Sequence, residues 1–136
     1  MIFQETPPMT EQELWQKMTD TAVKALEDVK AKNITVLDTT EKTPLFARMI
    51  IASGDSTRQV KALANSVAVD LKEAGFTVQG SEGQESGEWA LVDAGDLVVH
   101  VMLPAVRDYY NIEALWGGEK PSFHTGAEKP WHAADH

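Results

Sequence analysis

Two aspartates in the stretch WALVDAGDLVVHV, residues 89–101, lie close enough in sequence to do chemistry. Asp93 and Asp96 flank Ala94-Gly95, and two neighbouring carboxylates can bind a divalent cation or share a proton. A four-residue turn explains them with fewer assumptions, because Gly95 supplies a positive φ and aspartates accept hydrogen bonds from nearby backbone N–H groups. A metal-dependent, nucleotidyltransferase-like enzyme that uses Asp93 and Asp96 is the alternative.

His100 is the second candidate for chemistry. In a strand it points away from the face of Val99 and Val101. No Ser-His-Asp or Glu-x-x-His spacing accompanies it, so we expect a hydrogen-bonded core or interface residue rather than a catalyst. His132 and His136 are four residues apart and could meet a metal if helical, but the sequence around them has no helical period.

The junction Gly54-Asp55-Ser56 follows a predicted strand and opens a predicted helix. Such a turn can bind phosphate, because helix N-termini attract anions. It has neither the lysine nor the glycine spacing of a P-loop. Nucleotidyltransferases with a similar junction carry acids on the next strand, and the strand predicted here over 76–79 has none. We therefore expect Asp55 or Ser56 to cap the helix.

Hydrophobic periodicity predicts the elements that must position these residues. Helices are expected over 11–30, from the Gly54-Asp55-Ser56 junction to Gly75, and from Pro104 to Gly117. Strands are expected over 34–38, 45–52 and 76–79, and a hairpin over 89–101. This order indicates an α/β fold with a mixed sheet of about five strands flanked by helices. We expect one domain over 10–118, with a flexible lead over 1–9 and a flexible tail over 119–136.

Composition restricts the function. The chain has 136 residues, a net charge of −9 and no cysteine, which excludes disulfides and thiolate metal sites. No secretory signal and no apolar run of about 20 residues is visible, so we expect a cytoplasmic protein. We also expect no cofactor. A chain this acidic is repelled by phosphate backbones. We expect no direct DNA contact, little direct RNA contact, and attraction to a basic protein partner.

Aromatic residues supply candidate contacts with such a partner. The last predicted helix carries Tyr109, Tyr110 and Trp116, and aromatic residues are enriched at the centres of protein interfaces. For Trp116 we favour packing on the sheet. Trp89, which begins its strand near Glu82 and other acids, is the better candidate for an exposed anchor. A homodimer formed through these aromatic residues is a further possibility.

Four segments carry a resemblance to a known family. They are Gly-Asp-Ser-x-Arg-Gln-Val at 54–60, Glu-Gly at 82–83, Trp-Ala-Leu-Val-Asp-x-Gly-Asp-x-Val-Val-His-Val at 89–101, and Arg-x-x-Tyr-x-x-Glu-x-Leu-Trp at 107–116. Over about residues 11–116 the chain resembles the ribosomal silencing factors, also called Iojap-like proteins. The resemblance implies an α/β fold that is nucleotidyltransferase-like without the catalytic acids. It also implies binding rather than catalysis.

Members of that family dock on protein number fourteen of the large ribosomal subunit, at the face where the small subunit joins. The bound factor blocks subunit association and lowers translation when nutrients are scarce. The resemblance implies that seven residues contact the partner: Glu82, Trp89, Asp93, Gly95, Asp96, Arg107 and Tyr110. His100 is expected to brace the hairpin against the last helix.

The sequence departs from the family pattern in two places. Phe46-Ala47 stands where the family usually has Thr-Asp just before the second strand, so an acid is missing there. Ala94 replaces a bulkier residue that is often found in the turn, which reduces the apolar contact that the tip of the hairpin can make.

Overall fold

The computed structural model describes residues 9–83 and 85–117, so the predicted flexible segments 1–9 and 119–136 lie almost wholly outside it. The described elements are α1 (Glu11–Asp28), β1 (Lys32–Asp38), β2 (Arg48–Ser53), α2 (Thr57–Glu73), β3 (Gly80–Glu82), β4 (Trp89–Asp93), β5 (Leu97–Met102), α3 (Pro104–Tyr110) and α4 (Ile112–Leu115).

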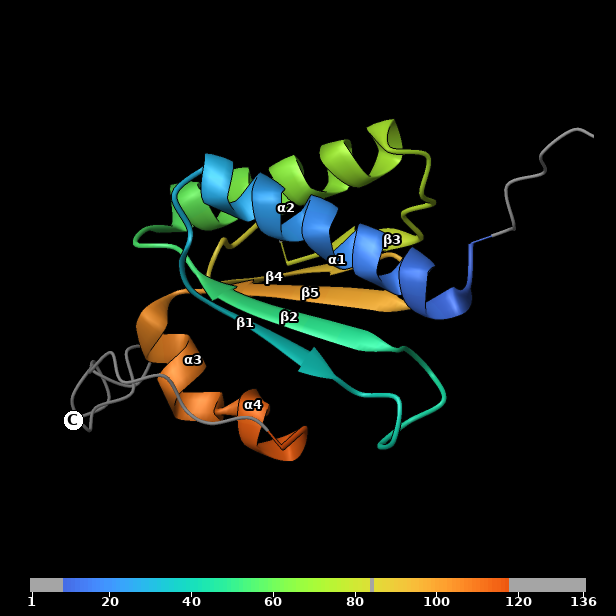
Figure 1. Ribbon diagram of the computed structural model, residues 1–136. Coiled ribbons are helices and arrows are strands. Elements are labelled where there is room, and N and C mark those ends of the chain that lie inside the picture. The colour runs from blue at the N-terminus through green and yellow to red at the C-terminus, as the bar shows by residue number, and fades with distance from the viewer. Residues whose placement is uncertain (1–8, 84, 118–136) are drawn as a thin grey trace, which may run out of the picture.

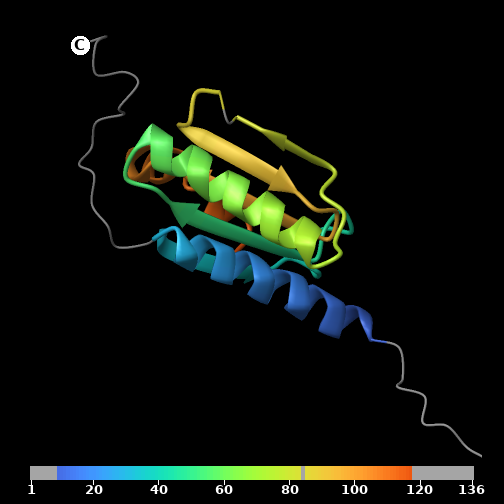
Figure 2. The ribbon, with the colours of Figure 1, turned by 90° about the horizontal axis from the view of Figure 1, so that it is seen from above.

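The five strands form one mixed sheet in the order β1-β2-β5-β4-β3. The central pair β2 and β5 is parallel, and the other neighbours are antiparallel. Helices α1 and α2 lie side by side on one face of the sheet, while α3 and α4 lie on the other face, below β1 and β2 (Figures 1 and 2). The predicted fold class, an α/β domain with a mixed five-stranded sheet, is confirmed.

Local sequence explains where the two long helices begin. Glu13 N donates to Thr10 Oγ1 over 3.1 Å while Thr10 N donates to Glu13 Oε1 over 2.9 Å, a reciprocal cap of α1. Ser56 caps α2, because its Oγ accepts from Gln59 N over 3.1 Å. The Gly54-Asp55-Ser56 junction is therefore a helix cap, as expected, with Ser56 rather than Asp55 as the capping residue.

Two apolar clusters hold the layers together. The larger cluster lies between the sheet and α1 and α2, and includes the fully buried Leu26, Leu63 and Val99. The smaller cluster lies on the opposite face, where Val106 and Ile112 pack with side chains of β2 and β5. The two faces of the sheet are thus covered unequally: the long helices α1 and α2 extend over one face, and the shorter α3 and α4 leave part of the other face open.

Two predicted elements are wrong. The strand expected over 76–79 begins only at Gly80, because Phe76 and Val78 pack half-buried against the main core as the chain returns from α2. The true strand carries an acid, Glu82, exposed on the edge of the sheet. The last helix is not continuous: Asn111 takes a left-handed conformation with φ of 45°, which Asn tolerates better than most residues, and this separates α3 from α4.

Candidate docking site

The hairpin predicted over 89–101 is confirmed as β4 and β5, joined by a tight turn. Ala94 N donates to Leu97 O over 2.9 Å, and Gly95 has φ of 84°. The register pairs Leu91 with His100. Alternation along the two strands then places Leu91, Val98 and His100 on the face opposite the main core. This is the face that α3 and α4 cover only in part (Figure 1).

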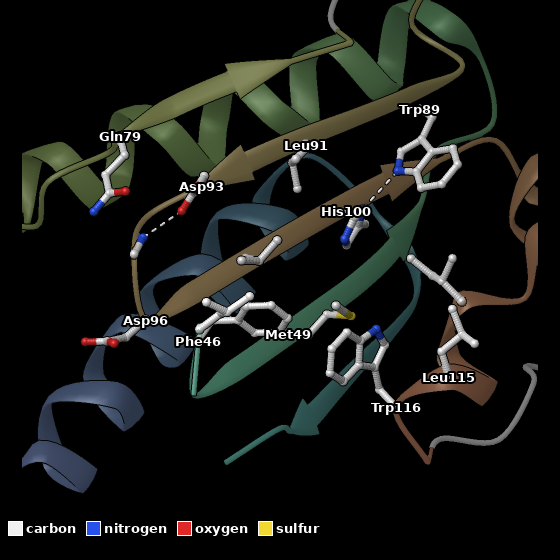
Figure 3. A pocket seen from close by; sticks show the side chains of 14 residues that line it. Phe46, Met49, Gln79, Trp89, Leu91, Asp93, Asp96, His100, Leu115 and Trp116 are labelled. Carbon is white, nitrogen blue, oxygen red and sulfur yellow. Dashed lines mark hydrogen bonds between the residues drawn. The ribbon is translucent and has the colours of Figure 1, made fainter. Parts of the chain in front are cut away.

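A groove of about 730 Å³ lies on this partly covered face. Leu91, Met49 and His100 lie along its centre, and Asp93 and Asp96 lie at one end (Figure 3). We call it the sheet groove. Two leucines on its rim, Leu45 and Leu115, are 78% and 72% exposed. Apolar side chains gathered in a hollow, with large leucines in contact with water, are typical of binding surfaces.

Trp116 forms one wall of the sheet groove together with Phe46. Their ring centroids lie 5.2 Å apart at an interplanar angle of 60°. Trp116 packs against its neighbours, as expected from its sequence, and in doing so lines the groove. Phe46, which belongs to the Phe46-Ala47 pair expected to depart from the family pattern, thus contributes an aromatic side chain to the groove.

Trp89 is held between two other ring side chains. Its Nε1 donates to Nδ1 of His100 over 2.9 Å (Figure 3), and its ring centroid lies 4.9 Å from that of Tyr110. Trp89 is half-buried, so it is not the free, exposed anchor that the sequence suggested. Only part of its ring surface, and not its N–H group, is available to a partner.

His100 is neutral at physiological pH. Burial lowers its pKa to about 4, and its Nδ1 must be unprotonated to accept the bond from Trp89. The imidazole lines the centre of the sheet groove (Figure 3). His100 contacts Trp89 of the same hairpin, and the Trp89 ring in turn packs on Tyr110 of α3. A bracing role for His100 stays a prediction.

The two aspartates of the turn have different surroundings. Asp93 Oδ1 accepts a 2.8 Å hydrogen bond from Gly95 N, the contact expected of a turn residue. The Asp96 side chain is exposed, while its backbone oxygen accepts from Ala47 N and Arg48 N. Among residues 9–83 and 85–117, no group of three or more His, Asp or Glu side chains is arranged to hold a metal ion.

Glu82 lies apart from the acidic turn. It sits opposite Leu91 on the edge strand β3, where it lines a smaller hollow with Trp89 and His100. The sheet groove therefore has acids on two sides: Asp93 and Asp96 at one end, and Glu82 beyond the edge of β4.

Arg107 does not lie on this surface, which corrects the expectation that it contacts a partner. It is 1% exposed, and its Nε lies 3.0 Å from Oε2 of the fully buried Glu113. Its other nitrogens donate to three acceptors on β1 and β2: Asn33 O, Thr35 Oγ1 and Ser53 Oγ. Burial lowers the pKa of Arg107 and the Glu113 carboxylate opposes that shift. The pair ties α3 and α4 to the sheet.

Sequence reasoning missed the apolar residues of the sheet groove. Leu91, Val98 and His100 share one strand face by alternation, and that signal was visible in the sequence. Leu45 and Leu115 reach the same groove from a loop and from α4, which requires the tertiary placement of both segments. Glu113 was likewise given no role, although it lies six residues after Arg107.

Comparison with known proteins agrees with this architecture. A family model described as "Ribosomal silencing factor during starvation" matches residues 12–135. The ribosomal silencing factor RsfS of Chromobacterium violaceum is 70% identical over 118 residues, which are 87% of this chain and 97% of that protein. A mouse protein named "Mitochondrial assembly of ribosomal large subunit protein 1" is 31% identical over 100 residues, which are 71% of this chain and 44% of that protein.

A crystal structure of a Chromobacterium violaceum protein has a TM-score of 0.82 to this structure at 71% identity, over 85% of this chain and 97% of that chain. The fold thus places this chain in the same class of small α/β proteins as that crystal structure. The chain belongs to the family of ribosomal silencing factors, and the family's description gives it a ribosome-associated silencing role. The resemblance seen in the four sequence segments is confirmed. No helix in the described ranges is long and apolar enough to cross a bilayer.

Proposed function

We propose that this cytoplasmic protein represses translation by binding the large ribosomal subunit through its protein number fourteen, at the face where the small subunit must join. The bound chain and the small subunit would compete for the same space, so occupancy alone would silence the particle. No catalytic step and no cofactor is required. The observation that supports this proposal best is an exposed apolar groove with an acidic end, on a family member described as a silencing factor.

The energetics of such docking are reasonable. Specific protein interfaces bury about 1,600 Å² in total, and a few apolar or aromatic anchors provide most of the binding free energy. In the sheet groove these anchors would be Leu91, Leu115 and the accessible part of the Trp89 ring. Tyr110, which is 48% exposed, would extend the contact beyond Trp89.

Charge would decide where the protein docks. With a net charge of −9, the chain is repelled by ribosomal RNA and attracted to a basic protein exposed among the RNA. Asp96, at the exposed tip of the turn, and Glu82, on the sheet edge, would face Lys or Arg of the partner. Gly95 would let the turn approach closely. Asp93, whose carboxylate accepts a hydrogen bond from Gly95 N within the turn, would add negative charge without contacting the partner directly.

Sedimentation with purified ribosomal subunits tests the proposal. We expect the protein to sediment with large subunits and not with small ones, and to reduce the light-scattering signal when both subunits are mixed. Asp96→Lys should weaken sedimentation at least tenfold. Glu73→Lys is the matched control, because it reverses an exposed acid at the end of α2, on the other face of the sheet. Sedimentation with small subunits alone, or equal losses in both variants, would contradict the proposal.

A further inference from the structure

The described chain ends beside the sheet groove. Leu115 and Trp116 both line the groove, and Gly117 is the last residue before segment 118–136. That segment has 19 residues. An extended chain spans about 3.3 Å per residue, so the segment can span roughly 60 Å, about three times the length of the six-residue strand β5 that crosses the groove.

The sequence of segment 118–136 complements the groove chemically. It contains two related motifs, Lys-Pro-Ser-Phe at 120–123 and Lys-Pro-Trp at 129–131. Each places an aromatic side chain two or three residues after a lysine. The sheet groove places apolar side chains next to Asp93 and Asp96. An aromatic ring on Leu91 and Met49 would therefore bring the lysine of the same motif towards the two aspartates.

Proline in each motif lowers the entropic cost of docking, because it restricts the free segment before it binds. The size also fits: a groove of about 730 Å³ lies within the range of about 300–1,000 Å³ that encloses small ligands. A segment tethered by a short linker has an effective concentration in the millimolar range. Weak contacts would therefore suffice for substantial occupancy.

We propose that segment 118–136 docks in the sheet groove through Phe123 or Trp131 and covers the surface that would otherwise bind a partner. This inference rests on the proposed function for its consequence but not for the docking itself. The segment acts as a tethered competitor, so a partner binds only the fraction of molecules with an open groove and its apparent affinity falls by that fraction. If about one molecule in ten is open, affinity falls about tenfold.

Nuclear magnetic resonance of the full chain, labelled with ¹³C on Met and Leu methyl groups, tests the docking. We expect nuclear Overhauser effects between the methyl groups of Met49, Leu91 or Leu115 and an aromatic ring of the segment. They should disappear in F123S/W131S and persist in the control T125A/H136A, which changes two polar residues of the same segment. The two single variants identify the motif that docks. Identical methyl spectra for the wild type and F123S/W131S would overturn the inference.

Two further measurements separate the alternatives. In a mixture of labelled, deuterated chains with unlabelled, protonated chains, nuclear Overhauser effects between the two kinds of chain would place a second copy in the groove. That result would overturn the proposal. Sedimentation with purified large subunits then measures the consequence: F123S/W131S should bind about tenfold more tightly than the wild type. Docking with unchanged affinity would overturn the regulatory role. If no variant binds large subunits, the proposed function fails, whereas the methyl contacts would still establish that the segment docks.

Discussion

The indole Nε1 of Trp89 donates a 2.9 Å hydrogen bond to Nδ1 of His100, and this bond exists only while Nδ1 carries no proton. Burial of the imidazole, which lowers its pKa to about 4, works in the same direction. The central residue of the sheet groove is therefore a neutral histidine that is hydrogen-bonded to Trp89 on the neighbouring strand. Both the free energy of unfolding and the geometry of the groove depend on the protonation state of this histidine.

The first prediction concerns pH. The pKa of His100 falls from 6.5 unfolded to about 4 folded, so between these values the unfolded chain binds the extra proton. The contribution of His100 is fully present above about pH 6.5 and declines as pH falls towards 4. At pH 4.5 we expect the wild type to have lost about 2 kcal/mol from this source.

Urea unfolding at several pH values measures this loss. The variant His100→Gln keeps an acceptor for Trp89 Nε1 but does not titrate, so its stability should decline less between pH 6.5 and 4.5. The carboxyl pKa values of Glu13 and Asp38 are lowered by hydrogen bonds with Thr10 and Thr40. Their contributions are therefore lost at lower pH, and equally in both proteins. Parallel pH profiles for the two proteins would contradict the prediction.

The second prediction concerns the buried ion pair. Arg107→Met leaves the Glu113 carboxylate buried without its cation, and breaking such a pair typically costs about 3–5 kcal/mol. We expect a loss of this size in the free energy of unfolding, measured with urea. The double variant Arg107→Met/Glu113→Leu should be more stable than Arg107→Met alone, because it removes the uncompensated charge. A double variant that is less stable than Arg107→Met would show that the charge is not the cause.

The third prediction separates binding from stability in the sheet groove. Leu115 is 72% exposed, so Leu115→Ser should change stability by no more than about 0.5 kcal/mol. It should still weaken sedimentation with large ribosomal subunits at least tenfold if the groove is the docking surface. Val69→Ser is the matched control, because Val69 is an exposed apolar residue on α2. Equal binding by the two variants would place the docking surface elsewhere.

The fourth prediction concerns the turn. Gly95 has φ of 84°, and a side chain in this conformation costs about 1–2 kcal/mol. A Cβ at this position would also lie 3.1 Å from Nε2 of Gln79. We expect Gly95→Ala to lower the free energy of unfolding by about 1–2 kcal/mol, which is measured as a lower midpoint of urea unfolding at an unchanged slope. An unchanged midpoint would mean that the turn relaxes into another conformation, which the crystal structure of the variant would reveal.

The fifth prediction addresses the enzyme alternative. Asp93 Oδ1 is engaged by Gly95 N, and the Asp96 carboxylate is exposed. We expect isothermal titration calorimetry with magnesium and nucleoside triphosphates to give no heat of binding. Saturable heat that is lost in Asp93→Asn would instead support a metal-dependent site at the turn.

Local signals in the sequence were sufficient for the elements that rest on local chemistry. Thr10 and Ser56 each cap a helix, and the turn at Gly95 joins two strands, because neighbouring residues alone satisfy those backbone groups. The return from α2 differs from the predicted strand because the alternation of Phe76 and Val78 looks the same in a strand as in a loop that packs on a core. The break at Asn111 had no pattern that distinguishes it from a continuous helix.

The site shows the same division. The acidic turn and the place of His100 on the hairpin follow from residues close together in the chain. The burial of Arg107 does not, because three of its four acceptors lie more than fifty residues earlier, on β1 and β2. The sheet groove exists because α3 and α4 leave part of one sheet face open, and their placement is decided by that distant network.

The helix α4 has only four residues, far fewer than the 12–15 or so that an isolated helix needs to persist in water. It is retained by Glu113, whose carboxylate reaches Arg107 inside the protein. The packing of Ile112 on the sheet and of Trp116 on Phe46 adds to this hold. The position of Leu115 at the rim of the sheet groove therefore depends on a charge pair that lies inside the protein, so a substitution that never touches the surface should still alter the shape of the groove.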